Sequence, residues 1–272
     1  MSEHLLDVSG LTLDLKVGRD YKPIILGTSW WVDRGEALAL VGESGSGKSL
    51  SARSVIRLLP PTARLGGDVV FDGVSMLSVP PAQLRAIRAS RIAMIFQDPR
   101  AYINPIHTVA DFLCEGLVRT RGVSRSDARR LAVDRLHDVG IRDADRRLQQ
   151  LPHELSGGLL QRVMIAAALM AEPTLLLADE PTTALDVTTQ EEVMAILDDL
   201  RTERGLAMVF ITHDLDLATA VCDRLVVMQA GRVVETLGAA EIYTAARDAY
   251  TRSLVEARAG FDLPDTNREG VR

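Results

Sequence analysis

Short, fully apolar runs recur along the chain and alternate with longer amphipathic stretches. The runs lie at residues 37–41, 175–178, 207–211 and 225–228. Uninterrupted apolar runs of this length are typical of strands buried on both faces of a parallel sheet. Helical spacing of apolar residues near 188–203 and at 215–221 separates the later runs. This alternation predicts an α/β fold with a parallel-sheet core.

The N-terminal segment has a two-residue periodicity instead. Residues 5–15 alternate between apolar and polar side chains, and residues 30–40 are rich in strand-forming residues. We expect two strands here, joined by a loop at residues 18–23. The next predicted elements are a strand at 69–71, a helix at 81–89 and a strand at 91–96.

Residues 99–171 lack strand signals and show helical periodicity. One predicted helical face carries side chains three or four residues apart: Ala128, Leu131, Ala132, Arg135, Leu136 and Val139. Gly140 follows where a helix commonly ends. The pattern predicts a helical insert at about 99–171 within a domain of residues 1–258, followed by a short polar tail at 259–272.

The overall composition argues against some classes of function. Lys and Arg number 31 against 37 Asp and Glu, so the formal net charge is −6, and aromatic residues make up 4% of the chain. Binding of nucleic acid usually needs basic and base-stacking surfaces, so we expect none. No apolar run approaches the roughly 20 residues of a membrane-spanning helix, and the first ten residues do not resemble a secretory signal. We therefore expect membrane association only through a partner, and free thiols at Cys114 and Cys222 in a reducing compartment.

The sequence at 42–49 matches the pattern G-x-x-x-x-G-K-[ST] without a mismatch. It contains Gly42, Glu43, Ser44, Gly45, Ser46, Gly47, Lys48 and Ser49. It lies between the apolar run at 37–41 and a predicted helix at 50–59, where backbone N–H groups and a helix N-terminus can bind phosphate. We expect these residues and Leu50 to bind a nucleotide, with Lys48 at the β- and γ-phosphates and Ser49 on Mg²⁺. The alternative is a glycine-rich turn that binds nothing.

A pair of acidic residues ends the apolar run at 175–178. Beside a phosphate loop, Asp179 would lie near Mg²⁺, and Glu180 would face the γ-phosphate as the general base toward the attacking water. The alternative is an ordinary strand followed by a solvated turn. The presence of the phosphate loop favours the catalytic interpretation.

A third motif, at residues 155–162, resembles the signature of a known family. Leu155, Ser156, Gly157 and Gly158, followed by Gln161 and Arg162, precede an apolar helix expected at 163–171. Alone, this stretch fits a plain helix cap as well as a close approach of backbone to an anion. With the preceding motifs it resembles the signature of ATP-binding cassette (ABC) ATPases, over about residues 5–257. The remaining matches, in that family's order, are Gln97 in the Q-loop, Ala184, Leu185 and Asp186 in the D-loop, and His213 as the switch histidine.

The resemblance implies a fold and a set of roles. The fold is an α/β P-loop NTPase, namely an ABC nucleotide-binding domain with a parallel-sheet core, an N-terminal antiparallel β subdomain and a helical insert. Two cassettes pair head to tail, so that Ser156, Gly157 and Gly158 contact the γ-phosphate bound on the opposite subunit, and Asp186 belongs to the same nucleotide-binding set.

For two polar residues the resemblance implies roles around the γ-phosphate. Gln97 senses Mg²⁺ and water and links the insert to the core. His213 donates a hydrogen bond to the γ-phosphate, unless it is an ordinary surface histidine beside Asp214.

Two positions match the family less well. An early aromatic residue usually stacks on adenine, and Tyr21 is the candidate, whereas Trp30 and Trp31 are assigned to the core and the sheet surface. Leu160 stands where many members carry a polar or basic residue, which predicts an altered contact with the second cassette or the permease. Glu180 is present together with the switch histidine, so the cassette is expected to hydrolyse ATP.

The resemblance therefore predicts an ATP-hydrolysing, energy-coupling subunit of a membrane ABC importer that uses ATP and Mg²⁺. Its expected partners are a second ATPase subunit, thought to be a different chain, two integral-membrane permease subunits and an extracytoplasmic substrate-binding protein. The permease would hold it at the cytoplasmic face of the membrane through a groove near residues 97–107, and the chain itself would not touch cargo. The alternatives are a cassette of a cytoplasmic enzyme complex, such as one that degrades phosphonates, and a soluble ABC protein.

The cargo is predicted from longer motif sequences. Those at 42–49, 96–99, 104–105, 179–186 and 250–254 resemble the oligopeptide, dipeptide and nickel importer group, as a D-type subunit. Those at 104–108 and 159–166 look closer to its nickel and metallophore branch. The choice between peptide and nickel import stays open at this point.

Overall fold

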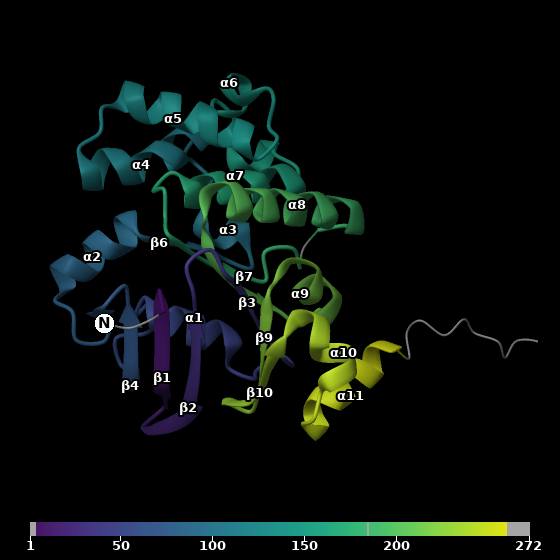
Figure 1. Ribbon diagram of the computed structural model, residues 1–272. Coiled ribbons are helices and arrows are strands. Elements are labelled where there is room, and N and C mark those ends of the chain that lie inside the picture. The colour runs from purple at the N-terminus through teal and green to yellow at the C-terminus, as the bar shows by residue number, and fades with distance from the viewer. Residues whose placement is uncertain (1–3, 184, 260–272) are drawn as a thin grey trace, which may run out of the picture.

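The computed structural model describes residues 4–183 and 185–259, and a six-stranded sheet lies at its centre (Figure 1). The strands are β3 (Ala37–Val41), β6 (Ile92–Ile95), β7 (Leu175–Asp179), β8 (Ala207–Thr212), β9 (Arg224–Gln229) and β10 (Arg232–Gly238). They are ordered β10-β9-β3-β8-β7-β6. All neighbours pair in parallel except β9 and β10, which form an antiparallel hairpin. The predicted α/β fold with a parallel-sheet core is confirmed.

The apolar runs form strands because both faces of this sheet are covered. In β3, Ala37, Ala39 and Val41 belong to one buried apolar cluster, and Leu38 and Leu40 belong to another. Successive side chains of a strand point to opposite faces, so the two clusters lie on opposite sides of the sheet. One cluster continues into the helices, and the other continues under a second sheet.

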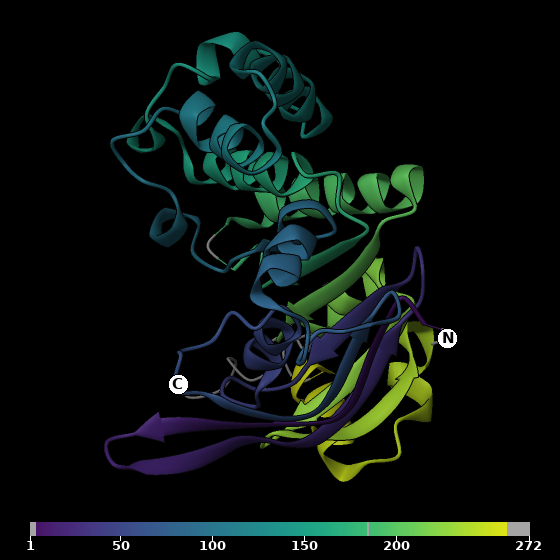
Figure 2. The same ribbon diagram turned by 90° about the vertical axis from the view of Figure 1, so that its left-hand side faces the viewer.

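The second sheet is the predicted antiparallel subdomain. Its strands are β1 (Leu6–Val17), β2 (Asp20–Val32), β4 (Arg64–Phe71) and β5 (Val74–Ser75), ordered β2-β1-β4-β5. Figure 2 shows the β1–β2 hairpin reaching well beyond the rest of the molecule. The strand predicted at 69–71 is only the end of β4.

Two expectations for this region are wrong. The loop predicted at 18–23 is a two-residue turn, because Gly18 adopts φ +63° and β2 begins at Asp20. The single strand predicted at 30–40 is two strands in different sheets, β2 and β3. The apolar side chains on both sides conceal the turn between them, in which Gly35 has φ +72° and the Glu36 amide donates to the Asp33 carbonyl.

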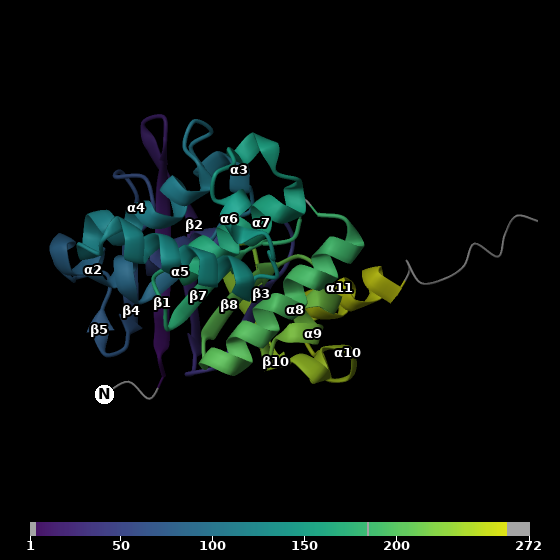
Figure 3. The same ribbon diagram turned by 90° about the horizontal axis from the view of Figure 1, so that it is seen from above.

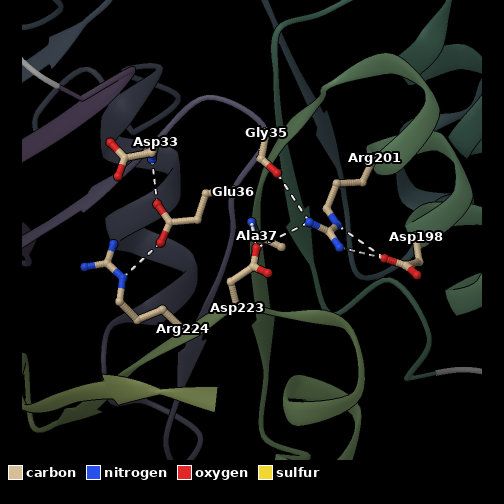
Figure 4. Close-up of polar contacts among 8 residues, drawn as sticks. All are labelled: Asp33, Gly35, Glu36, Ala37, Asp198, Arg201, Asp223 and Arg224. Carbon is tan, nitrogen blue, oxygen red and sulfur yellow. Dashed lines mark hydrogen bonds and ion pairs between the residues drawn. The ribbon is translucent and has the colours of Figure 1, made fainter. Parts of the chain in front are cut away.

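Side chains fix this turn at the N-terminal end of β3 (Figure 4). The Glu36 carboxylate accepts the Asp33 N–H at 2.6 Å and the Arg224 Nε at 2.9 Å. Asp223 accepts the Ala37 N–H at 2.8 Å. The turn is therefore held to β9, away from the strand ends that carry the predicted motifs.

The tryptophans beside this turn lie as predicted. Trp30 is buried, and Trp31 is 38% exposed. The Arg224 guanidinium lies 4.1 Å from the centre of the Trp31 ring.

Helices cover the parallel sheet and form the insert. Beside the sheets lie α1 (Lys48–Val55), α2 (Pro81–Ser90), α8 (Val187–Arg204) and α9 (Leu215–Val221). The insert contains α3 (Pro99–Tyr102), α4 (Val109–Arg121), α5 (Arg125–Asp138), α6 (Ala144–Arg147), the 3₁₀ turn Pro152–Glu154 and α7 (Gly157–Leu169). Figures 1 and 3 show it stacked on one side of the sheet. The C-terminal elements are the 3₁₀ turn Ala239–Glu241, α10 (Ile242–Ala245) and α11 (Ala249–Ala259).

The predicted helical face of α5 is present. Ala128, Ala132, Leu136 and Val139 are buried, and the helix gives way to Gly140 with φ +75°. The helix expected at 50–59 instead begins at Lys48 and ends at Val55, before Pro60.

The predicted boundary at 259 falls at the last residue of α11, and residues 260–272 lie outside the described residues. The division into domain and tail stays a prediction. Within the described residues, no helix has both the length and the apolar character needed to cross a bilayer. Cys114 and Cys222 are buried free thiols, and burial raises the pKa of both.

Candidate functional site

Four neighbouring parallel strands bring the predicted motifs to one edge of the sheet. β6, β7, β8 and β3 lie side by side, with Asp179 paired to Ile211 and Val41 paired to Thr212. The segments that follow these strands therefore emerge together. In open parallel sheets this carboxyl edge is where ligands bind.

Glycines allow the loop after β3 to adopt its shape. Gly42 has φ +143°, and a Cβ there would lie 2.1 Å from the Met228 carbonyl oxygen. Gly47 has φ +103° and is the N-cap of α1. The Gly231 amide donates to the Ser46 carbonyl at 3.0 Å. The phosphate-loop residues thus lead directly into a helix N-terminus, while Glu43, Ser44 and Gly45 are exposed.

Lys48 lies inside this loop and is 5% exposed. Its Nζ donates to the carbonyl oxygens of Gly42 at 2.6 Å and Glu43 at 2.8 Å. Burial lowers the pKa of Lys48, and the nearby Glu180 and Asp179 carboxylates oppose that effect. The ammonium is therefore desolvated, close to two acidic groups and available to an anion in the loop.

The two predicted metal ligands of α1 and β7 are in contact. Ser49 Oγ donates to Asp179 Oδ1 at 2.6 Å, and the Asp179 side chain is only 1% exposed. Arg53 Nη2 donates to the other oxygen, Oδ2, at 3.1 Å. Sequence reasoning missed Arg53, although its spacing of four residues from Ser49 on one helix face was a signal.

The residue after Asp179 gathers the other predicted catalytic side chains. Glu180 Oε2 accepts hydrogen bonds from Gln97 Nε2 and Thr183 Oγ1, both at 2.9 Å. His213 Nδ1 lies 3.5 Å from Glu180 Oε1. The backbone of Glu180 is left-handed, with φ +45°, and its N–H donates to the Ile211 carbonyl at 3.0 Å. Residues that follow three different strands thus converge on one carboxylate.

The glycine-rich signature and the D-loop form a second group. Ser156 caps α7, and its Oγ accepts the Leu159 N–H at 3.4 Å. Asp186 caps α8 by accepting the Thr189 N–H at 3.0 Å, and that backbone hydrogen bond lowers the pKa of Asp186. A Cβ on Gly158 would lie 2.6 Å from Thr189 Cγ2, so the starts of α7 and α8 touch. Ala184 of the predicted D-loop lies outside the described residues.

This second group is separate from the phosphate loop of the same chain. In Figure 1, α7 lies in the upper part of the molecule and α1 in the lower part. Within residues 4–183 and 185–259, no hydrogen bond joins residues 156–158 to residues 42–50. Gly157 is open, with no atom within 4 Å of a Cβ built on it.

At three other positions discussed from the sequence, the side chains pack within this chain. Tyr21 lies in β2, not in a loop, and the Arg64 guanidinium covers its ring at 3.5 Å from the centroid. Its stacking on adenine stays a prediction. Leu50 packs against the apolar cluster beneath the antiparallel sheet. Leu160 is buried in the core, and its effect on the contact with the second cassette or the permease stays a prediction.

One contact of the phosphate loop comes from the far end of the chain. The Glu43 N–H donates to the hydroxyl oxygen of Tyr250 in α11 at 2.9 Å, across 207 positions of sequence. Sequence reasoning missed this contact because no local pattern links the two residues.

Comparison with known proteins places the chain among ATP-binding transport proteins. Residues 26–183 match the sequence profile of the ABC transporter family. The chain is 43% identical to the peptidoglycan transport ATP-binding protein YejF of Agrobacterium fabrum, over 98% of this chain and 49% of that protein. It is 43% identical to the probable peptide ABC transporter ATP-binding protein y4tR of Sinorhizobium fredii, over 97% and 78%. It is 41% identical to the oligopeptide transport ATP-binding protein OppD of Bacillus subtilis, over 92% and 71%. The chain thus spans about half the length of YejF and more than two thirds of the other two.

Solved structures of ATP-binding cassettes have the same fold as this chain. A dimeric post-hydrolysis structure of the ATP-binding cassette MJ0796, bound to ADP and phosphate, has a TM-score of 0.76 at 30% identity, over 86% of this chain and 98% of that one. CbiO1 from Clostridium perfringens, part of the transporter complex cbiONQ, has a TM-score of 0.76 at 27% identity, over 97% of both chains. The family profile covers more than half of the chain, and the relatives above 40% identity align along nearly all of it. This chain therefore belongs to the ABC transporter family, as an ATP-binding cassette ATPase.

Proposed function

We propose that this chain binds ATP with Mg²⁺, hydrolyses it and thereby drives a membrane importer for peptides. The observation that carries the proposal is the convergence of phosphate-loop, acidic and polar side chains at the carboxyl edge of four adjacent parallel strands. The pattern is that of phosphoryl transfer, in which positioning and charge neutralisation dominate.

The phosphate loop supplies the anion site. Its backbone N–H groups and the start of α1 face the phosphates, from Gly42 to Leu50. Lys48 exchanges its two carbonyl partners for β- and γ-phosphate oxygens. Its existing bonds of 2.6 and 2.8 Å keep the ammonium within the loop until that exchange.

The donor set beside the loop suits Mg²⁺. Ser49 Oγ and the Asp179 carboxylate are hard oxygen donors already in contact, and Gln97 has a side-chain carbonyl in the neighbouring cluster. We assign these three residues to hold the ion, directly or through water. The bound ion supplies positive charge to the β- and γ-phosphate oxygens.

Glu180 is the proposed general base. Its carboxylate, 15% exposed, accepts a proton from the attacking water. Hydrogen bonds from Gln97 and Thr183 fix its orientation. His213 is 60% exposed and adjacent, so it can turn toward the γ-phosphate and donate to it.

The signature and D-loop residues are proposed to complete the site of a second cassette. Ser156, Gly157, Gly158 and Asp186 lie apart from the phosphate loop of their own chain, as a head-to-tail pair requires. The related cassette MJ0796 has been solved as a dimer bound to ADP and phosphate. We propose that the partner cassette is a different chain.

The segment after Gln97 is the proposed permease contact. Phe96 and Tyr102 stack with ring centroids 3.7 Å apart, and Tyr102 and Ile106 are 44% and 77% exposed. The residue after Ile106, His107, lines a cavity of about 310 Å³ whose other walls carry mainly charged side chains from α4 and the start of α5. Exposed apolar side chains next to a hollow with charged walls fit an amphipathic cytoplasmic helix of either of two permease subunits, which would hold the chain at the cytoplasmic face of the membrane.

Peptides are the proposed cargo. Relatives above 40% identity are named for peptide, oligopeptide or peptidoglycan transport. These names favour peptides over nickel, because the prediction of nickel import depends on the resemblance of short motifs alone. An extracytoplasmic binding protein and the permease would select the cargo without help from this chain.

Uptake measurements test the proposal. A strain lacking this chain should accumulate less labelled peptide, and the wild-type gene should restore uptake while Glu180→Gln should not. Labelled nickel, free and chelated, serves as the second substrate. Unchanged uptake of both, or failure of the chain to copurify with any integral-membrane protein, would contradict the transport assignment.

A further inference from the structure

Asp179 has a basic partner that the proposed chemistry does not use. Arg53, one turn after Ser49 in α1, donates from Nη2 to Asp179 Oδ2 at 3.1 Å. Ser49 holds the other oxygen, Oδ1, at 2.6 Å. The two residues lie four apart on one helix, so they reach the carboxylate from the same side.

The buried carboxylate needs a positive partner. The Asp179 side chain is 1% exposed, and a buried charge without compensation is strongly destabilising. Lys48 does not make that contact, because its Nζ is bonded to the carbonyls of Gly42 and Glu43. Among the residues that the structure describes, Arg53 is the cation in direct contact with Asp179.

Arg53 is held loosely. Within the described part of the chain its side chain makes one hydrogen bond, the contact with Asp179, and that side chain is 29% exposed. Its Nε is buried with no hydrogen-bond partner among the residues the structure describes. A guanidinium with one bond and a route to solvent can be displaced by a stronger cation.

We propose that Arg53 is a displaceable counter-ion of Asp179 that competes with Mg²⁺ and sets the Mg²⁺ concentration needed for tight ATP binding. The inference rests on the proposed metal site at Ser49 and Asp179. The divalent ion must approach a carboxylate that already has a cationic partner, and the two positive charges repel at short range. Each Mg²⁺ ion therefore binds with displacement of the guanidinium.

The test measures nucleotide binding, not turnover. In a Glu180→Gln background that keeps ATP intact, a fluorescent ATP analogue at fixed concentration is titrated with Mg²⁺. Arg53→Met removes the charge but keeps an apolar stem, and it should lower the Mg²⁺ midpoint roughly three- to tenfold. Arg53→Lys, which keeps the charge, should stay within about twofold of the parent.

A matched control and a second readout separate this role from a general loss of stability. Arg34→Met breaks a surface ion pair with Asp72 and should leave the midpoint unchanged. In chelator without nucleotide, Arg53→Met should lower the unfolding temperature, and added Mg²⁺ should raise it more than in the parent. If Arg53→Met does not fold, Arg53→Gln carries the same expectation.

The outcomes distinguish the two proposals. A parent protein that binds ATP equally well with and without Mg²⁺ overturns the metal site and the inference with it. A Mg²⁺-dependent parent whose midpoint Arg53→Met and Arg53→Gln leave unchanged or raise overturns the counter-ion role alone.

Discussion

At the residue scale, Glu180 is the side chain on which hydrolysis should depend most. Glu180→Gln keeps the shape and the hydrogen bond from Gln97 but cannot accept a proton from water. In an assembled complex whose partner cassette is also disabled, we expect ATP binding to persist and turnover to fall about 10²- to 10⁴-fold. Phosphate release and equilibrium nucleotide binding measure the two quantities. Turnover at the parent rate would show that another group activates the water.

An added methyl group should destabilise the protein at one glycine of the predicted site and leave its stability unchanged at another. Gly42→Ala places a Cβ 2.1 Å from the Met228 carbonyl at φ +143°, so we expect a loss of about 3 kcal/mol or more in unfolding free energy, and weak ATP binding. Gly157→Ala meets no atom within 4 Å and should leave stability unchanged. Urea denaturation compares them. Equal midpoints for the two variants would contradict the strain assigned to the loop.

The site residues that sequence reasoning found belong to short sequence motifs, and those it missed do not. Lys48 and Glu180 stand at fixed positions in short motifs that follow buried strands. Arg53 was recognisable only after Ser49 had been assigned, through helical spacing. Tyr250 reaches the loop from a helix about 200 positions away, so only the fold brings it there.

At the element scale, burial decides which strands the sequence predicts. β7 and β8 are covered on both faces, so their apolar runs match the observed strands within one residue. The hairpin of β1 and β2 is half exposed, and the turn before β3 lies between two apolar runs. There the pattern suggested one strand because a turn of Asp33, Gly35 and Glu36 depends on backbone conformation more than on hydrophobicity.

The contact of α11 with the phosphate loop should matter for nucleotide affinity. Tyr250→Phe removes the acceptor of the Glu43 N–H, and Glu43 also provides a carbonyl partner of Lys48. We expect a stability loss of about 1 kcal/mol and several-fold weaker ATP binding. Tyr243→Phe, which removes a hydrogen bond from α10 to Asp216 of α9 and none to the phosphate loop, is the matched control. An equal effect of both variants on ATP binding would mean that α11 does not position the loop.

At the scale of the whole molecule, ion pairs join the helical insert to the sheet-bearing core. Arg204 of α8 and Arg135 of α5 both pair with Asp138, and Arg162 of α7 pairs with Glu192 of α8. The start of α7 is therefore held against α8 as one face of the molecule. That face carries the signature residues and Asp186, while the phosphate loop lies elsewhere, so we propose that each molecule contributes one half to each of two different sites.

This division predicts that the isolated chain is a weak ATPase. A dilute monomer can bind ATP at its own phosphate loop but cannot supply the second half of that site. The rate of ATP hydrolysis should therefore rise more steeply than the concentration of the chain, and it should rise further when the partner cassette is added.

Point variants separate the two halves of the site. Ser156→Arg in this chain should leave its own ATP affinity unchanged and reduce turnover at the partner's site, whereas Lys48→Ala should weaken its own ATP binding. Light scattering during the assay reports the oligomeric state. Full activity of a dilute monomer, or loss of its own ATP binding in Ser156→Arg, would show that one chain forms a complete site.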